Sequence, residues 1–180
     1  MISCLDIFLV LFCSLAIAFD VSTHRIPNWF IFLALIGGLA FNTWHGTANL
    51  LSSLSGFVLG MGILFVPFAL GIVGAGDVKL VGAVGAILGA SWLPRVLFYT
   101  VCLGGGLALV SVLMNGVNWQ VFTGVWQDIK VLWVSQGKVL PDGVALKSRK
   151  GVRAIPYGVA IALGTLVAFY IDPEGRWAGF

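Results

Sequence analysis

Six long apolar stretches constrain this chain more than any other feature of its sequence. They cover residues 2–19, 28–44, 50–73, 78–92, 95–114 and 154–171. A helix needs about 20 apolar residues to cross the hydrocarbon core of a bilayer. Only 9% of the residues are charged, whereas soluble domains carry about 25%. The sequence therefore predicts an all-α integral membrane protein with about six transmembrane helices, folded as a single domain over residues 1–180.

The stretch between the fifth and sixth apolar segments has a different character. Over residues 118–136, apolar positions that include Trp119, Trp126 and Trp133 recur at helical spacing, and polar residues lie elsewhere on the helical wheel. This pattern predicts one amphipathic helix in the membrane interface, with its tryptophans at headgroup level. A folded flap over the functional site is the alternative. We expect the polar tract over residues 138–153 to be a loop.

Small residues recur in the third and fourth apolar segments. The third contains Gly56-x-x-x-Gly60, and in the fourth Gly82, Ala86 and Ala90 share one helix face. Lipid provides no hydrophobic driving force between helices, so close van der Waals packing has to hold them together. We therefore expect these segments to lie close to their neighbours.

The basic residues fall mostly on one side of a six-span topology. One side holds Arg25, Lys79, Lys130, Lys138, Lys147, Arg149, Lys150 and Arg153, and the other holds Arg95 and Arg176. The positive-inside rule puts the first side in the cytoplasm and both termini outside it. The basic cluster at residues 147–153 could instead bind anionic lipid or an acidic partner. A net charge of +3 does not indicate a nucleic-acid partner.

Two acids stand at the ends of apolar segments. Asp20 ends the first segment, and Asp77, in the sequence Gly74-Ala75-Gly76-Asp77, joins the third to the fourth. An ionisable group at such a depth is a candidate functional residue, because hydrocarbon cannot solvate its charge. The remaining acids fall at the opposite face or outside the spans, at Asp6, Asp128, Asp142, Asp172 and Glu174. We therefore expect Asp20 and Asp77 to meet, with the first and fourth helices adjacent.

Two carboxyl groups that share a proton can hydrolyse a peptide bond. The ionised group takes a proton from water, and the protonated group polarises the carbonyl and assists the leaving amine. Gly74 and Gly76 would let the turn adopt dihedral angles forbidden to other residues and would let backbone approach a substrate. Lys79 would pair with Asp77 or with a lipid headgroup. The residues thus favour an aspartyl peptidase within the membrane.

Other chemistries find little support in the sequence. Ser22, Thr23 and His24 are adjacent, but no acid–base arrangement makes them a nucleophilic triad. His24 and His45 belong to loops at opposite faces, so we expect no metal site. The Gly74–Asp77 turn lacks the G-K-[ST] ending of a phosphate-binding loop. No cofactor is expected.

Three motifs resemble those of the type IV prepilin peptidases, which are intramembrane aspartyl proteases of the GxGD type. They are Asp20-x5-Ile26-Pro27-Asn28, Gly74-Ala75-Gly76-Asp77-Val78-Lys79-Leu80 and Ile155-Pro156-Tyr157-Gly158. The resemblance implies that Asp20 and Asp77 are catalytic and that Gly74 and Gly76 form the supporting turn. It implies supporting roles for Pro27, Asn28, Lys79, Pro156, Tyr157 and Gly158. The substrates implied are prepilins and pseudopilins, cut after a short basic leader at the cytoplasmic face.

The chain departs from the larger members of that family in one respect. Those members add an amino-terminal cytoplasmic region with paired C-x-x-C motifs and methylate the new amino terminus, whereas this chain opens on a span and has no C-x-x-C. It is similar to the short peptidases of tight-adherence (Flp) pilus systems, which implies peptidase activity in a bacterial inner membrane without methyltransferase activity. Archaeal preflagellin peptidases share the same core motifs.

Two other classes of protein remain as alternatives. In an ion- or proton-coupled transporter component, the same aspartates would act as relay groups. Such a pathway should line several spans with polar residues, and the second, third, fifth and sixth spans are nearly bare of them. In a structural scaffold, the acids would only pair with Lys79 and Arg25.

Overall fold

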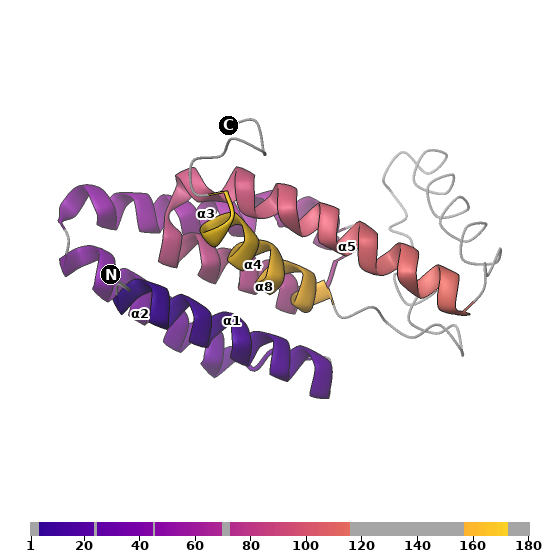
Figure 1. The fold of residues 1–180 in the computed structure, drawn as a ribbon. Helices are drawn as coiled ribbons and strands as arrows, with labels where there is room; N and C mark the ends of the chain where they lie inside the picture. Colours follow the sequence, from indigo (N-terminus) through magenta and orange to yellow (C-terminus); the bar gives the residue numbers. More distant parts are fainter. Residues whose placement is uncertain (1–3, 24, 45, 70–72, 116–156, 173–180) are drawn as a thin grey trace.

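The computed structural model describes residues 4–23, 25–44, 46–69, 73–115 and 157–172 (Figure 1). These ranges contain six α-helices and one short 3₁₀ helix. The elements are α1 (Cys4–Thr23), α2 (Asn28–Trp44), α3 (Thr47–Ala69), α4 (Ala75–Leu88), η1 (Ala90–Trp92), α5 (Leu93–Asn115) and α8 (Tyr157–Tyr170). The predicted interfacial helix at 118–136 and the predicted loop at 138–153 lie outside the described residues.

The first and fourth helices differ from the sequence prediction at their ends. α1 continues past Asp20 to Thr23, and in this last turn the hydroxyl of Ser22 bonds back to the Ala18 carbonyl and that of Thr23 to the Phe19 carbonyl, at 2.6 and 2.8 Å. α4 begins at Ala75, so Asp77 lies in the first turn of a helix rather than in a turn before it. Both acids are therefore held on helical backbone.

The helix α4 is the centre of the bundle. It packs against α2, α3 and α8, while α8 also packs against α1 and α5. Its residues from Leu80 to Ile87 are all buried. Figure 1 shows the helices lying lengthwise beside one another as one bundle. With 14 residues, α4 is about 21 Å long at the usual helical rise, shorter than a hydrocarbon core of about 30 Å.

Glycines set how closely α4 approaches its neighbours. Gly56 on α3 lies against Gly85 on α4, so closely that a Cβ on either would overlap the carbonyl of the other. A Cβ on Gly60 would lie 2.8 Å from the Val81 carbonyl oxygen, and one on Gly38 of α2 would lie 3.1 Å from the Ala86 backbone. The close approach expected from Gly56-x-x-x-Gly60 is thus confirmed.

The carboxyl end of α4 is buried, and side chains from two other helices satisfy its carbonyl groups. The Asn42 amide on α2 donates to the carbonyl oxygens of Ala86 and Ile87 at 3.3 and 3.1 Å, and the Ser53 hydroxyl on α3 also donates to Ala86. Gly89 ends the helix with a φ of +90°, which favours glycine. Such caps matter because lipid cannot bond exposed backbone.

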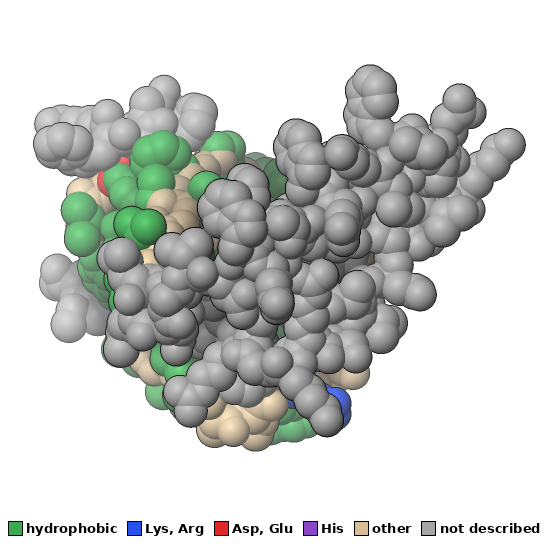
Figure 2. Space-filling view, turned by 90° about the vertical axis from the view of Figure 1, so that its right-hand side faces the viewer, with side chains coloured by type: hydrophobic (Ala, Val, Ile, Leu, Met, Phe, Trp, Pro, Cys, Tyr) green, Lys and Arg blue, Asp and Glu red, His purple; other side chains and the backbone are tan. Residues whose placement is uncertain are grey.

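The outer helices present apolar side chains away from the bundle. Three helical segments are long and apolar enough to cross a membrane, at Cys4–Thr23, Thr47–Ala69 and Ala90–Val110, and α2 and α8 are shorter apolar helices. Exposed side chains on them include Leu11, Phe32, Val58 and Val101. In the face shown by Figure 2, hydrophobic side chains predominate among the described atoms. These are the features of a multi-pass membrane protein.

Candidate active site

Asp20 lies in the last turn of α1 and is almost completely buried, with 7% of its surface exposed. Its Oδ2 atom accepts a hydrogen bond from the backbone N–H of Val159, in the first turn of α8, at 3.1 Å. The first N–H groups of a helix have no partner within that helix. A carboxylate on α1 thus caps the amino terminus of α8.

Asp77 lies in the first turn of α4 and is half-buried. Its Oδ2 atom accepts a hydrogen bond from the backbone N–H of Gly74, the residue before the helix, at 3.2 Å. Asp77 therefore caps the amino terminus of its own helix, where the helix dipole also favours a negative charge.

The two carboxylates lie within electrostatic reach of each other. Their helices are brought together mainly through α8, which packs on both α1 and α4, whereas direct packing of α1 on α4 is sparse. The expectation that the first and fourth helices are adjacent is corrected accordingly. Its physical reason is that α4 uses its small residues against α2 and α3.

The first turn of α8 contacts Asp20 and lies within electrostatic reach of Asp77. Besides the bond from Val159, Gly158 lies directly against the Asp20 carboxylate, and Tyr157 is within electrostatic reach of Asp77. The Tyr157 ring also packs on Gly104 of α5, where a Cβ would lie 3.1 Å from it. Pro156 lies outside the described residues.

The motifs around Ile26 and Gly76 are in contact. Lys79 donates a hydrogen bond from Nζ to Oδ1 of Asn28 at 2.9 Å, rather than pairing with Asp77. A Cβ on Gly76 would lie 4.0 Å from Cβ of Ile26. Pro27 directly precedes α2, and its carbonyl accepts the first bonds of that helix, from Phe30 and Ile31. Motifs far apart in sequence thus form one structural unit beside Asp77.

The glycines before Asp77 do not adopt the unusual dihedral angles expected of them. Gly74 has φ −76° and ψ 150°, which other residues also adopt, and Gly76 is helical. Positive φ values occur among the described glycines at Gly46 and Gly89. What Gly74 provides is space, because a Cβ there would lie 3.1 Å from Oδ2 of Asp77.

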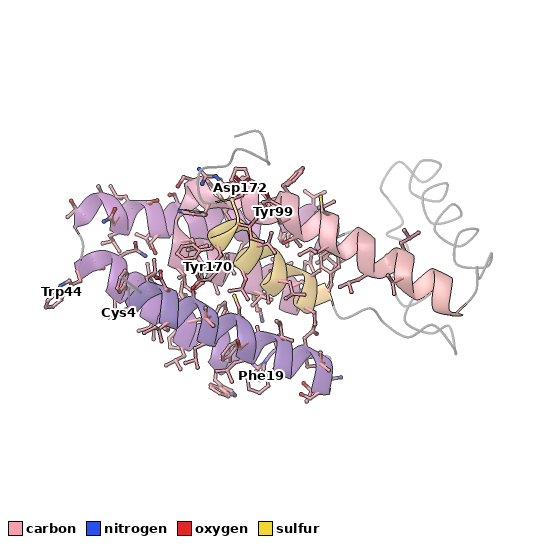
Figure 3. All side chains as sticks on the ribbon, viewed as in Figure 1. Cys4, Phe19, Trp44, Tyr99, Tyr170 and Asp172 are labelled. Atoms are coloured by element: carbon pink, nitrogen blue, oxygen red, sulfur yellow. The ribbon has the colours of Figure 1, made fainter. Side chains whose placement is uncertain are left out.

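Asp172, expected in an outer tail, is buried. It follows α8 directly and is 2% exposed, and its Oδ2 atom accepts a hydrogen bond from the Tyr99 hydroxyl of α5 at 2.9 Å. Figure 3 shows the two residues next to each other, where α5 lies beside the carboxyl end of α8. Asp20 and Asp77 meet the opposite end of α8, so Asp172 is remote from them.

The sequence reasoning missed two participants, the Val159 N–H and Gly104. A backbone donor leaves no mark in a sequence, but Gly104 is the first of three consecutive glycines within α5, and small residues in an apolar helix are a signal of close helix approach. Within the described ranges, no three His, Cys, Asp or Glu side chains gather in a way that could hold a metal ion.

Comparison with known proteins decides the family. A model of the Type IV leader peptidase family matches residues 7–109, which is more than half of the chain and includes Asp20 and Asp77. The chain belongs to this family. A curated relative in the type IV leader peptidase family, the Prepilin leader peptidase/N-methyltransferase of Escherichia coli (strain K12), is 34% identical over 103 residues.

The match to that relative is partial. It covers 53% of this chain and 46% of the relative, so the chain spans about half the length of the E. coli protein. The helix α8 lies outside the residues that the family model matches. No solved structure matches the chain significantly.

Proposed function

We propose that this chain is an intramembrane aspartyl endopeptidase that removes the basic leader of prepilins and pseudopilins. The observation that carries the proposal is the convergence of Asp20 and Asp77 at one end of the bundle, within electrostatic reach of each other. Membership of the type IV leader peptidase family supports the same reaction. The similarity to the E. coli relative, a Prepilin leader peptidase/N-methyltransferase, supports it as well.

The two carboxyl groups would divide the work of hydrolysis. One, ionised, accepts a proton from a water molecule held between the pair, and the other, protonated, donates a hydrogen bond to the scissile carbonyl. Like charges at close range disfavour double ionisation, which keeps one proton on the pair. The backbone bonds to Asp20 and Asp77 each use Oδ2. In this proposal Oδ1 of each carboxyl group would bind the water or the substrate.

The site faces the cytoplasm in this proposal. Arg25 follows α1 and Lys79 lies near the start of α4, at the end of the bundle that holds the acids. Arg95 lies near the start of α5, at the other end, with its guanidinium over the Trp92 ring at 4.8 Å. The positive-inside rule then supports a cytoplasmic site in a bacterial inner membrane. Flp-type pilins are the precursors we propose as substrates.

The test is precursor cleavage by variants that keep the shape of the acids. Asp20→Asn and Asp77→Asn should each abolish cleavage of a precursor with a basic leader ending in glycine before a long apolar segment, while the protein accumulates normally in the membrane. Asp6→Asn is the matched control, because Asp6 lies on the same helix as Asp20 but in its first turn. It should cleave at the wild-type rate. Retained cleavage by either Asp20→Asn or Asp77→Asn would end the proposal.

A further inference from the structure

The first turn of α8 contacts Asp20 and lies within electrostatic reach of Asp77. Gly158 and Val159 meet the carboxylate of Asp20, and Tyr157 is the residue within electrostatic reach of Asp77. A change in this turn would therefore change the position of the Asp20 carboxylate relative to Asp77. The turn lies outside residues 7–109, which the family model matches.

Gly158 leaves room that the Asp20 carboxylate occupies. A Cβ at this position would lie 2.7 Å from Oδ2, 2.9 Å from Cγ and 3.3 Å from Cβ of Asp20. These separations are well below the 3.5–4.0 Å of favourable contacts between carbon atoms. Any larger residue at position 158 would therefore push the carboxylate out of its present place.

The N–H of Val159 fixes the orientation of the same carboxylate. It is one of the first-turn donors that α8 itself cannot satisfy, and it donates to Oδ2 of Asp20 at 3.1 Å. The positive end of the α8 dipole points at the same group. Space at residue 158 and a donor at residue 159 thus act on one side chain.

The turn is itself held firmly. Tyr157 packs on Gly104 of α5, and further along α8 a Cβ on Gly164 would lie 2.7 Å from the backbone nitrogen of Thr100. α8 packs extensively on α5 and α1. This packing holds its first turn in place, and the turn holds the Asp20 carboxylate.

We infer that the first turn of α8 is the positioning element for Asp20, with Gly158 providing the space for its carboxylate and the Val159 N–H fixing the orientation of that carboxylate. This inference rests on the proposed function. Gly158 and Val159 are positioning residues here, because they act through Asp20 and not on the substrate.

The first experiment adds one methyl group. With the full chain in membranes and the basic-leader precursor as probe, Gly158→Ala should lower kcat by about 10- to 100-fold with KM unchanged, because displacements of about 1 Å cost up to about 10²-fold in rate. Gly164→Ala is the packing control, since it crowds α5 rather than Asp20. It should reduce accumulation but leave kcat per folded molecule at the wild-type value.

The second experiment removes one backbone hydrogen-bond donor. Val159→Pro deletes the N–H bonded to Asp20, and proline is tolerated in the first turn of a helix. We expect a kcat loss of about tenfold or more, again with KM unchanged. Val159→Ala keeps the N–H and should retain the wild-type kcat, which separates the backbone donor from the side chain.

The outcomes separate this inference from the proposed function. If Asp20→Asn is inactive while Gly158→Ala and Val159→Pro cleave at the wild-type rate, the positioning role is wrong and the peptidase proposal stands. If Asp20→Asn cleaves normally, the proposed function itself fails. If one of these two α8 variants does not accumulate, the kcat of the other one tests the positioning role. If neither accumulates, the turn is a folding element and the positioning role is overturned.

Discussion

Lys79 on α4 donates a hydrogen bond to the side-chain oxygen of Asn28 on α2 at 2.9 Å. Lys79 stands two residues after Asp77, and Asn28 is the first residue of its helix. The bond therefore ties the start of the acid-bearing helix to the start of α2. It gives a physical reason why two motifs that are distant in sequence occur together in one chain.

This bond predicts that Asn28 and Lys79 act as a pair. Asn28→Ala and Lys79→Met should each lower kcat/KM by a few-fold, because a single hydrogen bond contributes about 0.5–1.5 kcal/mol. The double variant should be no worse than either single one, since each removes the same interaction. A double-mutant cycle on precursor cleavage measures this coupling. Fully additive losses would show that the two residues work separately.

The space at Gly74 leads to a second prediction. In Gly74→Ala the new Cβ would lie 3.1 Å from Oδ2 of Asp77, so the carboxylate must shift by a few tenths of an ångström. We expect kcat to fall by about tenfold with normal accumulation. Kinetics of purified protein, normalised to folded molecules, provide the measurement, and an unchanged kcat would contradict it.

Gly76→Ala is the companion to that variant. Its Cβ would meet Ile26 at 4.0 Å, an ordinary contact, and alanine is favoured over glycine within a helix by up to about 1 kcal/mol. Accumulation and thermal stability should therefore equal or exceed the wild-type values. If kcat/KM nonetheless falls, the glycine is needed for the approach of the substrate backbone, as the sequence predicts.

The contact between Gly56 and Gly85 predicts a strong effect on folding. Gly56→Ala would drive a Cβ into the Gly85 carbonyl, and overpacking of this kind costs about 1–3 kcal/mol. Thermal unfolding in detergent should show a clear loss of stability. Gly62→Ala is the matched control on α3, because nothing lies within 4 Å of its Cβ. Equal stability of the two variants would contradict the close packing of α3 on α4.

The bond between Tyr99 and Asp172 predicts a loss of stability without a loss of chemistry. Tyr99→Phe leaves the buried Asp172 carboxylate with one partner fewer, at a cost of about 1–3 kcal/mol. Because Asp172 follows the end of α8 remote from Asp20, the kcat of the remaining folded protein should be unchanged. Tyr170→Phe serves as the control, since Tyr170 is 53% exposed. It should unfold at the wild-type temperature.

The helices could be predicted from hydropathy because the backbone N–H and C=O groups of an apolar segment in lipid must form hydrogen bonds with one another, as they do in a helix. The bounds of α2, residues 28–44, agree with the prediction. The carboxyl end of α1 was misjudged because hydropathy falls at Asp20, whereas the helical backbone continues through polar residues to Thr23. Gly74 to Asp77 was interpreted as a turn, although Gly74 is only the residue that caps α4.

The site could be predicted only in part. Alternating spans place the end of α1 and the start of α4 at the same face, which is enough to pair Asp20 with Asp77. The contribution of α8 depends on a contact between residues 20 and 159, and no local pattern encodes such a contact. The burial of Asp172 was missed for the same reason, because its partner Tyr99 is 73 residues away.

The central place of α4 has a consequence for how the protein would respond to different lipids. A helix of 14 residues that is enclosed by α2, α3 and α8 offers almost no surface to acyl chains. Changes in bilayer thickness act on helices that contact lipid, by tilting them or by deforming the bilayer around them. The outer helices would absorb that adjustment, and the helix that carries Asp77 would keep its depth in membranes of different composition.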